Sequence, residues 1–597
     1  MQSPNRDNPL IVHADRTVAL ETFSPLAEEA RAAIAPFAEL EKAPDYLHTY
    51  RITPLSIWNA ASAGWGGDAM VDALARFTKF PLPGNVQVDI RELAGRWGRL
   101  RLVRKDGDGL LLRVSDGDQA LLLELMRNDR LKPLLNGTRG ASAVEVSLGH
   151  RGRVKQALLT LGWPVQDLAG YEDGGAVPLE LAVGVEVRPY QQAAAEAFFQ
   201  AGSSEGGSGV VVLPPGSGKT VVGLAAMAMV GQRTLVLTTS RTSVNQWRRE
   251  LLAKTTVTAD RIAEYGPRGK NVADVTLCTY QMLVSRARGR SGGAGAPLGG
   301  ESATSAGAAD PAEPAERTLA DYPHMELLRE HGWGMVIYDE VHLLPAHVFR
   351  MTAEIQARRR LGLTATLVRE DGREGDVFSL IGPKRFDTAW RTLERQGWIA
   401  EASCCEVRLD FSAEERMEHA LADPRSRFRL ASENPGKLAM VREILTRHEG
   451  QPALVIGQYL DQLGDVALDL GAPIITGATP QARREELFAA FRAGSVPVLV
   501  LSKVGNFALD LPDAAVMVQV SGAFGSRQEE AQRLGRLLRP QANGSPVHFY
   551  TLITRETEEE TFAQNRQRFL TEQGYSYRIL DAAELLNPAA PPAEMLN

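Results

Sequence analysis

Short apolar runs alternate with stretches of helical spacing over most of the chain after residue 187. The first group of apolar runs lies at 209–213, 233–240, 274–280, 334–341 and 360–366. A second group lies at 452–459, 472–477, 496–503, 515–521 and 547–553. Apolar strands that alternate with helices are typical of a parallel sheet covered on both faces. The pattern therefore predicts two successive α/β lobes, at 185–385 and 386–585.

The first third of the chain has a different pattern. Residues 1–45 are expected to form a mobile or weakly helical extension. Helical apolar spacing then appears at 53–64, 68–79 and 88–98, and two strand-like runs at 99–105 and 110–115 flank the turn sequence DGDG. Three helices followed by a two-stranded ribbon have the order of a winged-helix-like domain, predicted at 46–135, although a small α+β packing domain fits equally well. A connecting segment is predicted at 136–184.

Two further segments differ from their surroundings. Residues 286–316 are rich in Gly, Ala, Ser and Pro and interrupt the first lobe. Such a composition cannot bury a core, so this insert is predicted to be disordered. Residues 586–597 are expected to form a C-terminal tail.

Composition excludes several classes of protein. The three cysteines, Cys278, Cys404 and Cys405, do not provide a disulfide framework, and no CxxC pair suggests zinc. The N-terminus has no signal-peptide pattern, and no apolar run reaches the length of about 18 residues that a membrane span needs. A cytoplasmic protein without a membrane partner is expected. The formal net charge of −7 argues mildly against a protein coated in nucleic acid, but local basic grooves are compatible with it.

A glycine-rich turn links the apolar run at 209–213 to a helical stretch. The turn reads PPGSGKT, and it contains Gly216, Ser217, Gly218, Lys219 and Thr220. Backbone N–H groups in such a turn point at a phosphate, the lysine reaches the β- and γ-phosphates, and the threonine hydroxyl holds Mg²⁺. The strict phosphate-loop pattern is not met, because Leu213 stands where its first glycine would be. A glycine-rich strand-to-helix turn without a ligand is the alternative.

Two acids and a histidine follow the apolar run at 334–338. In nucleotide hydrolases, a carboxylate at the tip of a neighbouring strand holds Mg²⁺, and Asp339 fits this role. Glu340 is then placed to orient and deprotonate the attacking water. His342 is near enough in sequence to sense the γ-phosphate. A metal-hydrolase cluster or an ordinary acidic loop would be the alternatives, and the former lacks the two-histidine spacing of a zinc helix.

The second lobe carries a basic motif, QRLGRLLR, at 532–539. Arg536 and Arg539 are three residues apart and share one face of a helix. Two guanidiniums that face the cleft between the lobes could stabilise the charge of the transition state as arginine fingers. In isolation, a solvated basic helix face explains this motif at least as well.

Together these motifs resemble a superfamily 2 helicase of the DEAH/DExH kind, and longer stretches resemble the XPB family. The stretches are LHTYRITPLSIWNAASAG, DEVHLLPAHVF, LGLTATLVRED, FSLIGPKRFDTAW, SKVGNFALDLPDA, GSRQEEAQRLGRLLR and QRFLTEQGYSY. The resemblance implies an XPB-type N-terminal domain followed by two RecA-like lobes. It also implies that the segment at 136–184, between the N-terminal domain and the first lobe, is damage-recognition-like. It implies a DNA-dependent ATPase and 3′-to-5′ helicase or translocase of repair or transcription, with ATP and Mg²⁺ as cofactors.

The resemblance also implies roles for individual residues. Arg188, Tyr190, Gln191, Gly505, Asp510 and Gln532 match nucleotide-binding elements, and Thr220 and Asp339 match the Mg²⁺ ligands. Thr239, Gln246, Trp247, Thr279 and Tyr280 match elements of the first lobe that lie on the DNA backbone. Thr364, Ala365 and Thr366 match the motif that couples hydrolysis to DNA movement. Arg369, Glu370 and Asp371 match a charged triplet used in strand separation.

Some features depart from the family pattern. Asn506 stands where the family often has Asp, the insert at 286–316 is not typical, and a thumb-like insertion at 411–437 matches loosely. One alternative is the motor part of a restriction or RNA-remodelling machine, and another is a nucleotide-dependent DNA-binding scaffold that scarcely turns over. Forked or single-stranded DNA is the expected partner. A nuclease partner is plausible by analogy with archaeal relatives, and a monomer is favoured.

Overall fold

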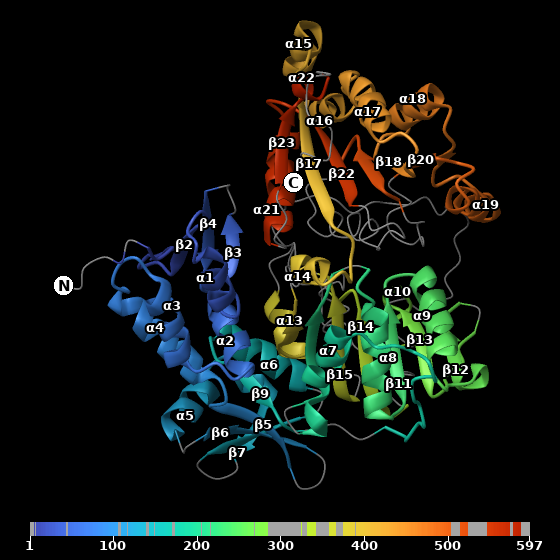
Figure 1. Cartoon of the computed structure of the whole chain (residues 1–597). Helices are drawn as coiled ribbons and strands as arrows, with labels where there is room; N and C mark the ends of the chain where they lie inside the picture. Colours follow the sequence, from blue (N-terminus) through green and yellow to red (C-terminus); the bar gives the residue numbers. More distant parts are fainter. Residues whose placement is uncertain are drawn as a thin grey trace.

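A computed structural model of the chain shows a series of α/β units (Figure 1). The structure describes residues 5, 7–42, 46–105, 109–115, 118–138, 142–147, 150–169, 174–203, 206–214, 216–267, 269–283, 324, 331–341, 357–365, 374–388, 390–502, 514–522, 546–572 and 577–586. Two small domains precede two larger lobes, and Figure 1 shows the second lobe, in orange and red, above the first, in green and yellow. None of the helices within these ranges is long and apolar enough to cross a membrane.

Among its described residues, the first lobe has a parallel sheet of seven strands in the order β12-β13-β11-β14-β15-β10-β16. Its strands are β10 (Ser208–Val212), β11 (Thr234–Thr238), β12 (Ile262–Tyr265), β13 (Val275–Thr279), β14 (Trp333–Asp339), β15 (Ala357–Thr364) and β16 (Lys384–Asp387). The central strands are buried on both faces, which explains their continuous apolar sequences. All the predicted apolar runs of this lobe are strands, as expected.

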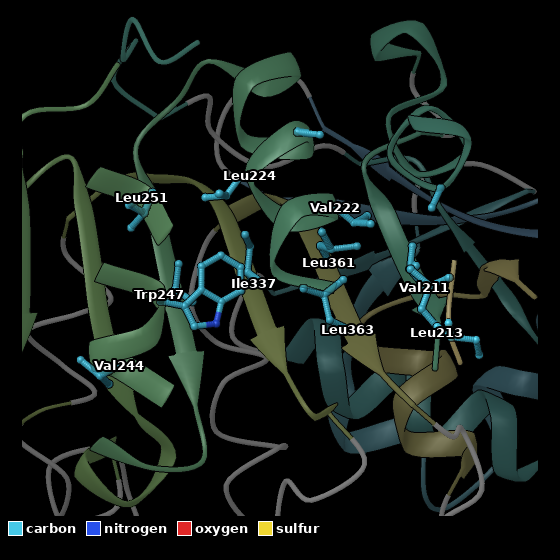
Figure 2. Packing of buried hydrophobic residues seen from close by; sticks show 14 of the residues in the cluster. Val211, Leu213, Val222, Leu224, Val244, Trp247, Leu251, Ile337, Leu361 and Leu363 are labelled. Atoms are coloured by element: carbon cyan, nitrogen blue, oxygen red, sulfur yellow. The ribbon is translucent and has the colours of Figure 1, made fainter. Parts of the chain in front are cut away.

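Helices cover this sheet and supply its core. They are α7 (Pro189–Phe199), α8 (Lys219–Val230), α9 (Arg241–Lys254), α10 (Tyr280–Leu283) and α13 (Glu374–Leu380), and α14 (Trp390–Arg395) follows in the connection to the second lobe. On one face of the sheet, Val222 and Leu224 of α8 pack with Trp247 of α9 against Ile337 and Leu363 of the strands (Figure 2). This packing fixes the start of α8 against the ends of β10 and β14.

The second lobe repeats the design, with a parallel sheet in the order β19-β20-β18-β21-β22-β17-β23. Its strands are β17 (Ala402–Leu409), β18 (Ala453–Gly457), β19 (Ile474–Ile475), β20 (Val498–Ser502), β21 (Val516–Gln519), β22 (Val547–Thr554) and β23 (Tyr577–Asp581). Its helices are α15 (Ala413–Leu421), α16 (Pro424–Ser432), α17 (Gly436–Arg447), α18 (Leu460–Leu470), α19 (Gln481–Arg492), α21 (Glu558–Glu572) and α22 (Ala582–Leu585). The prediction of two parallel α/β lobes in tandem is therefore confirmed.

The N-terminal residues correct the prediction of an extension at 1–45. They form β1 (Leu10–Val12), β2 (Thr17–Glu21), α1 (Ala27–Ile34), β3 (Glu39–Lys42) and β4 (Leu47–Arg51), and the strands pair in the order β1-β2-β4-β3. The helices α2 (Pro54–Ser62), α3 (Gly67–Phe77) and α4 (Gly84–Arg96) share a core with this sheet. Leu10, Leu20 and Phe37 are fully buried in it, so these residues belong to the first domain.

The prediction of a winged-helix-like domain at 46–135 is also wrong, because its three helices and its two strands belong to different domains. The predicted ribbon, β5 (Leu100–Arg104) and β6 (Leu110–Val114), does not pack on the three helices before it. It joins β7 (Leu135–Thr138), β8 (Ala143–Val146) and β9 (Val165–Asp167) in a sheet of order β7-β8-β6-β5-β9. Helices α5 (Gln119–Arg127) and α6 (Arg151–Thr160) complete a second small domain with its own core. The boundary therefore falls near residue 97 and not at 135.

Both small domains contact the end of the first lobe. The backbone N–H of Lys384 donates to Asn59 Oδ1 at 3.1 Å, and the rings of Trp97 and Phe378 meet edge-on at 5.6 Å. The predicted boundary at 385/386 cuts β16, which pairs with β10, so the first lobe extends to Asp387. The predicted insert at 286–316 and, apart from Leu586, the predicted tail at 586–597 lie outside the described residues.

Candidate active site

The glycine-rich turn lies where the sequence places it, between the end of β10 and the start of α8. Gly216 and Gly218 have φ values of 78° and 82°, in the left-handed region that glycine enters without strain. Helix α8 begins at Lys219, so the backbone N–H groups of its first turn are directed at any anion that binds in the glycine-rich turn. The N–H of Leu213 donates to Thr364 O at 2.9 Å, which joins the turn to the end of β15.

Three residues predicted to bind the nucleotide, Arg188, Tyr190 and Gln191, form hydrogen bonds that support this turn. Tyr190 Oη and Gln191 Nε2 both donate to Ser217 O, at 2.5 and 2.7 Å. Gln191 Oε1 accepts from the backbone N–H of Arg188 at 3.0 Å. A Cβ on Gly218 would lie only 2.5 Å from Gln191 Nε2, so glycine is needed here for space as well as for conformation. The first predicted nucleotide element and the phosphate turn are thus one continuous site.

The two acids stand at the tip of β14, opposite the start of α8. Lys219 Nζ lies 3.1 Å from Glu340 Oε1, and both side chains are largely shielded from water. Glu340 has a φ of 51°, a left-handed conformation that costs a residue other than glycine about 1–3 kcal/mol. Burial, together with the neighbouring charge of Glu340, raises the pKa of Asp339 to about 6. The carboxylates of Asp339 and Glu340 repel each other, so a bound cation between or beside them would be favoured.

The donor atoms at this site fit Mg²⁺. Asp339 provides a carboxylate, and the hydroxyl of Thr220 belongs to the first turn of α8. Hard oxygen ligands of this kind suit magnesium, which is usually held by one or two carboxylates and by the phosphates of its substrate. Within the described ranges no group of three or more His, Cys, Asp and Glu side chains could hold a metal by itself. A magnesium ion shared with a nucleotide is consistent with both observations.

The predicted DNA-contact residues follow β11, β13 and β15 at the carboxyl edge of the same sheet. Thr239 follows β11, Thr279 ends β13 and Gln246 is exposed on α9. Thr364 and Ala365, at the end of β15, are buried and so lie beneath this surface. The structure therefore brings these segments together on the side of the lobe that carries the phosphate turn.

Two residues assigned with them take other places. Trp247 and Tyr280 are 1% and 4% exposed, so their side chains do not face a DNA backbone. Instead, Trp247 Nε1 donates to Asp339 Oδ2 at 2.9 Å and Tyr280 Oη donates to Asp339 O at 2.8 Å. The helical spacing of Val244, Trp247 and Leu251 on α9 already indicates a buried face, and that signal was available in the sequence.

Sequence reasoning also missed Trp398, in the connection between the lobes. Arg188 Nη1 donates to Trp398 O at 3.2 Å, and its guanidinium lies 5.1 Å from the centre of the indole ring. The ring of Tyr190 is 6.2 Å from that ring. A single tryptophan in a linker carries no pattern that would reveal this contact. Through these contacts, Trp398 connects Arg188 and Tyr190 of the first lobe to the start of the second lobe.

The remaining predicted site residues lie outside the described residues. They are His342, Thr366, Arg369, Glu370, Asp371, Gly505, Asp510, Gln532, Arg536 and Arg539. Their roles stay predictions from the sequence.

Three family models match successive parts of the chain. The model of the ERCC3/RAD25/XPB C-terminal helicase matches residues 393–591, and that of the type III restriction enzyme res subunit matches residues 184–369. A helicase conserved C-terminal domain model matches residues 10–139. The last match begins at β1, in agreement with the folded N-terminus.

Similar proteins extend over nearly the whole chain. The DNA 3′-5′ helicase XPB of Mycobacterium tuberculosis is 51% identical over 584 residues, which cover 98% of this chain and 100% of that protein. The DNA 3′-5′ helicase XPB of Kineococcus radiotolerans is 49% identical, with 97% of each chain covered. The general transcription and DNA repair factor IIH helicase/translocase subunit XPB of Antonospora locustae is 35% identical, with 98% of this chain and 83% of that protein covered.

Proposed function

The chain belongs to the XPB family of helicases, and we propose that it is an ATP-hydrolysing DNA helicase that moves 3′ to 5′ along DNA. The observation that carries the proposal is the meeting of Lys219, Asp339 and Glu340 beside the N-terminus of α8. A glycine turn, a lysine and two acids at one sheet edge are the parts that phosphoryl transfer from a nucleotide requires.

Each residue of the site has a defined task in this proposal. The N–H groups at the start of α8 and the ammonium of Lys219 neutralise the charge on the β- and γ-phosphates. Glu340 accepts a proton from the attacking water, and Tyr190 and Gln191 hold the phosphate turn in place through Ser217. Asp339 and Thr220 would hold Mg²⁺, which supplies Lewis-acid stabilisation of the phosphate oxygens when it is bound.

DNA is the proposed substrate, and the carboxyl edge of the first lobe is the proposed track. Thr239, Gln246 and Thr279 would contact phosphates of one strand without reading its sequence. In the second lobe, Arg536 and Arg539 would complete the ATP site as arginine fingers when the lobes close. Closing and reopening of the cleft would then move one lobe along the strand relative to the other. A role in DNA repair or transcription fits the relative from Antonospora locustae, which is named as a subunit of general transcription and DNA repair factor IIH.

The test is steady-state ATPase with and without DNA, together with unwinding of duplexes that carry a 3′ or a 5′ tail. DNA is expected to stimulate ATP hydrolysis, and the 3′-tailed duplex is expected to unwind. Because phosphate contacts release counterions, DNA affinity should fall steeply as salt rises, despite the net charge of −7. Stimulation that does not change over a several-fold rise in salt would contradict a phosphate-tracking surface.

Two alternative functions predict different results in these assays. A nucleotide-dependent scaffold would bind ATP and DNA and hydrolyse scarcely any ATP. A motor of an RNA-remodelling machine would respond to RNA more strongly than to DNA. A nuclease partner, a monomeric state and a cytoplasmic location remain predictions, which affinity capture from the source cells, light scattering and cell fractionation would test.

A further inference from the structure

We propose that Trp247 and Tyr280 are positioning residues that hold Asp339 from two sides and link it to the segments facing DNA. The inference rests on the proposed function, because it assigns Asp339 to Mg²⁺ and the carboxyl edge of the sheet to DNA. It differs from the motif match, which places both side chains on the DNA backbone. Their burial excludes that role, and their hydrogen bonds supply another.

Trp247 is fixed by packing before it meets Asp339. It is among the largest fully buried side chains in the described part of the chain, and its ring lies between α8 and β14 (Figure 2). A Cβ on Gly223 of α8 would come within 2.5 Å of Trp247 Cη2, so α8 leaves room for the ring only because residue 223 is glycine. The ring cannot tilt without displacing α8, and its Nε1–H is therefore aimed at Asp339 Oδ2, 2.9 Å away.

Tyr280 holds the backbone of the same residue. It begins α10, directly after β13, and its hydroxyl donates to Asp339 O at 2.8 Å. One donor thus fixes the carboxylate and another fixes the main chain that carries it. The carboxylate cannot reorient freely about β14.

The residues that precede Trp247 and Tyr280 are exposed to solvent in full or in part. Gln246 precedes Trp247 on α9 and is exposed, and Thr279 precedes Tyr280 at the end of β13 and is partly exposed. Both neighbours are among the residues proposed to contact DNA. A small displacement of α9 or α10 by a DNA strand would therefore move the donor that holds Asp339. This arrangement provides a direct physical route from DNA contact to the metal site.

The experiment uses two conservative variants of the full-length protein. Trp247→Phe keeps an aromatic ring and removes the N–H, and Tyr280→Phe removes one oxygen. Trp58→Phe and Tyr265→Phe are matched controls, because Trp58 Nε1 donates to Leu93 O at 3.0 Å and Tyr265 Oη pairs with His324 Nδ1 at 3.0 Å, both away from Asp339. Binding of Mn²⁺ in the presence of a non-hydrolysable ATP analogue is followed by electron paramagnetic resonance, and thermal unfolding is followed in parallel.

Partners that orient a metal ligand usually change metal affinity about 10–100-fold when they are lost. Trp247→Phe is expected to weaken Mn²⁺ binding by about 10-fold or more, to raise the half-saturating Mg²⁺ concentration for ATPase, and to reduce the stimulation by DNA. Tyr280→Phe is expected to act in the same direction. The two control variants are expected to match the wild type in all three measurements. Both Trp→Phe variants lose buried volume, so their unfolding temperatures are expected to fall by similar amounts, whereas both Tyr→Phe variants are expected to unfold near the wild-type temperature.

Mn²⁺ affinity of Trp247→Phe within twofold of the Trp58→Phe value would overturn the positioning role. So would a lower unfolding temperature with unchanged affinity of the folded protein, because that result describes packing alone. If Trp247→Phe does not fold, Tyr280→Phe decides the question, since it deletes a single atom. Absence of DNA-stimulated ATPase in the wild type would instead reject the proposed function, and the Mn²⁺ measurement keeps the two failures apart.

Discussion

Lys219 and Glu340 form an ion pair across the proposed ATP site, with Nζ 3.1 Å from Oε1. They come from different elements, the first turn of α8 and the residue after β14, so the pair joins the phosphate turn to the acidic tip. The same two groups have opposite tasks in hydrolysis, since one neutralises phosphate and the other accepts a proton. Their variants are therefore expected to fail in different ways.

Lys219→Ala is expected to lower ATP turnover by about 100-fold or more, because it removes charge stabilisation from the transferred phosphate. Glu340→Gln keeps the shape of the side chain and removes the base, so ATP binding should persist while hydrolysis falls by about 100-fold or more. Binding of a fluorescent ATP analogue and steady-state ATPase rates separate the two effects. Near-normal turnover in Glu340→Gln would reject the role assigned to this residue.

The first small domain supplies controls for both changes. Lys79 and Glu21 form another lysine–glutamate pair, with Lys79 Nζ 2.6 Å from Glu21 Oε2, far from the phosphate turn in sequence. Lys79→Ala and Glu21→Gln should leave ATP turnover as it is in the wild type. A loss of turnover in these controls would show that the assay reports folding and not chemistry.

The charged triplet Arg369, Glu370 and Asp371 is predicted to separate strands and not to hydrolyse ATP. The helix that follows it, α13, packs against α6 of the second small domain, and its Phe378 ring meets the ring of Trp97 at the end of α4. We expect the triple alanine variant to keep most of its DNA-stimulated ATPase and to lose duplex unwinding, because the ATP cleft is unchanged. Both rates are measured on one forked duplex. A parallel fall in both would place the triplet in the motor, and no fall in either would make it a surface loop.

Lys437 is buried in the second lobe and holds three elements together. Its Nζ donates to Val520 O at 3.0 Å and to the two carboxylate oxygens of Glu559 at 3.0 and 2.9 Å. Lys437→Met leaves Glu559 buried without its cation, which usually costs about 3–5 kcal/mol. We expect this loss in the free energy of unfolding of the second lobe, measured by urea titration with hydrogen exchange in β22.

The exposed pair of Arg442 and Asp469 is the control for this change. Arg442→Gln is expected to lower the free energy of unfolding far less than Lys437→Met, because solvent already screens an exposed ion pair. A cost for Lys437→Met no larger than that for Arg442→Gln would show that water reaches Glu559 in the folded lobe.

Acid is expected to weaken the second lobe through His448. Its Nε2 lies 2.9 Å from Tyr550 Oη and its ring 4.4 Å from that of His548. Burial, and then the neighbouring His548, lower the pKa of His448 from 6.5 to about 4. As pH falls from about 6.5 to about 4, His448 is protonated in the unfolded chain but stays neutral in the folded lobe. The free energy of unfolding therefore decreases over that pH range.

His448→Gln, which does not titrate, should remove about 2 kcal/mol of this pH dependence by pH 4.5. The measurement is hydrogen exchange of the β22 amides in wild type and variant at matched pH. His13→Gln is the control, since His13 is exposed in the first small domain. If the wild type and His448→Gln lose stability equally on acidification, carboxylates or His548, whose pKa is also lowered by burial, govern the effect and not His448.

The lobes were predictable from sequence because parallel strands buried on both faces read as continuous apolar runs, as in β14 and β18. The phosphate turn and the two acids were predictable because phosphate and Mg²⁺ binding require particular residue types at fixed spacings in the sequence. The N-terminal sheet was missed since β3 reads ELEK and β1 has three residues, too few to show a period of two. Such strands are specified by their partners and not by their own sequence.

The contacts to Asp339 could not be read from sequence for a related reason. Trp247 lies 92 residues before Asp339 in the chain, and Tyr280 lies 59 residues before it. The pattern shows that Trp247 is buried, but only the strand order, which places β14 between β11 and β15, shows what it meets. Local pattern therefore predicts which residues are inside, and topology decides which of them touch.

The strand order of the first lobe also affects how the chain emerges from the ribosome. β10 pairs only with β15 and β16 among the described strands, and β15 begins about 145 residues after β10 ends. At about 5–20 residues per second, synthesis takes roughly 7–30 s to supply that partner. The two small domains are complete by residue 169 and are expected to fold first. During that interval the apolar strand β10 is the part of the nascent chain that a chaperone is expected to bind.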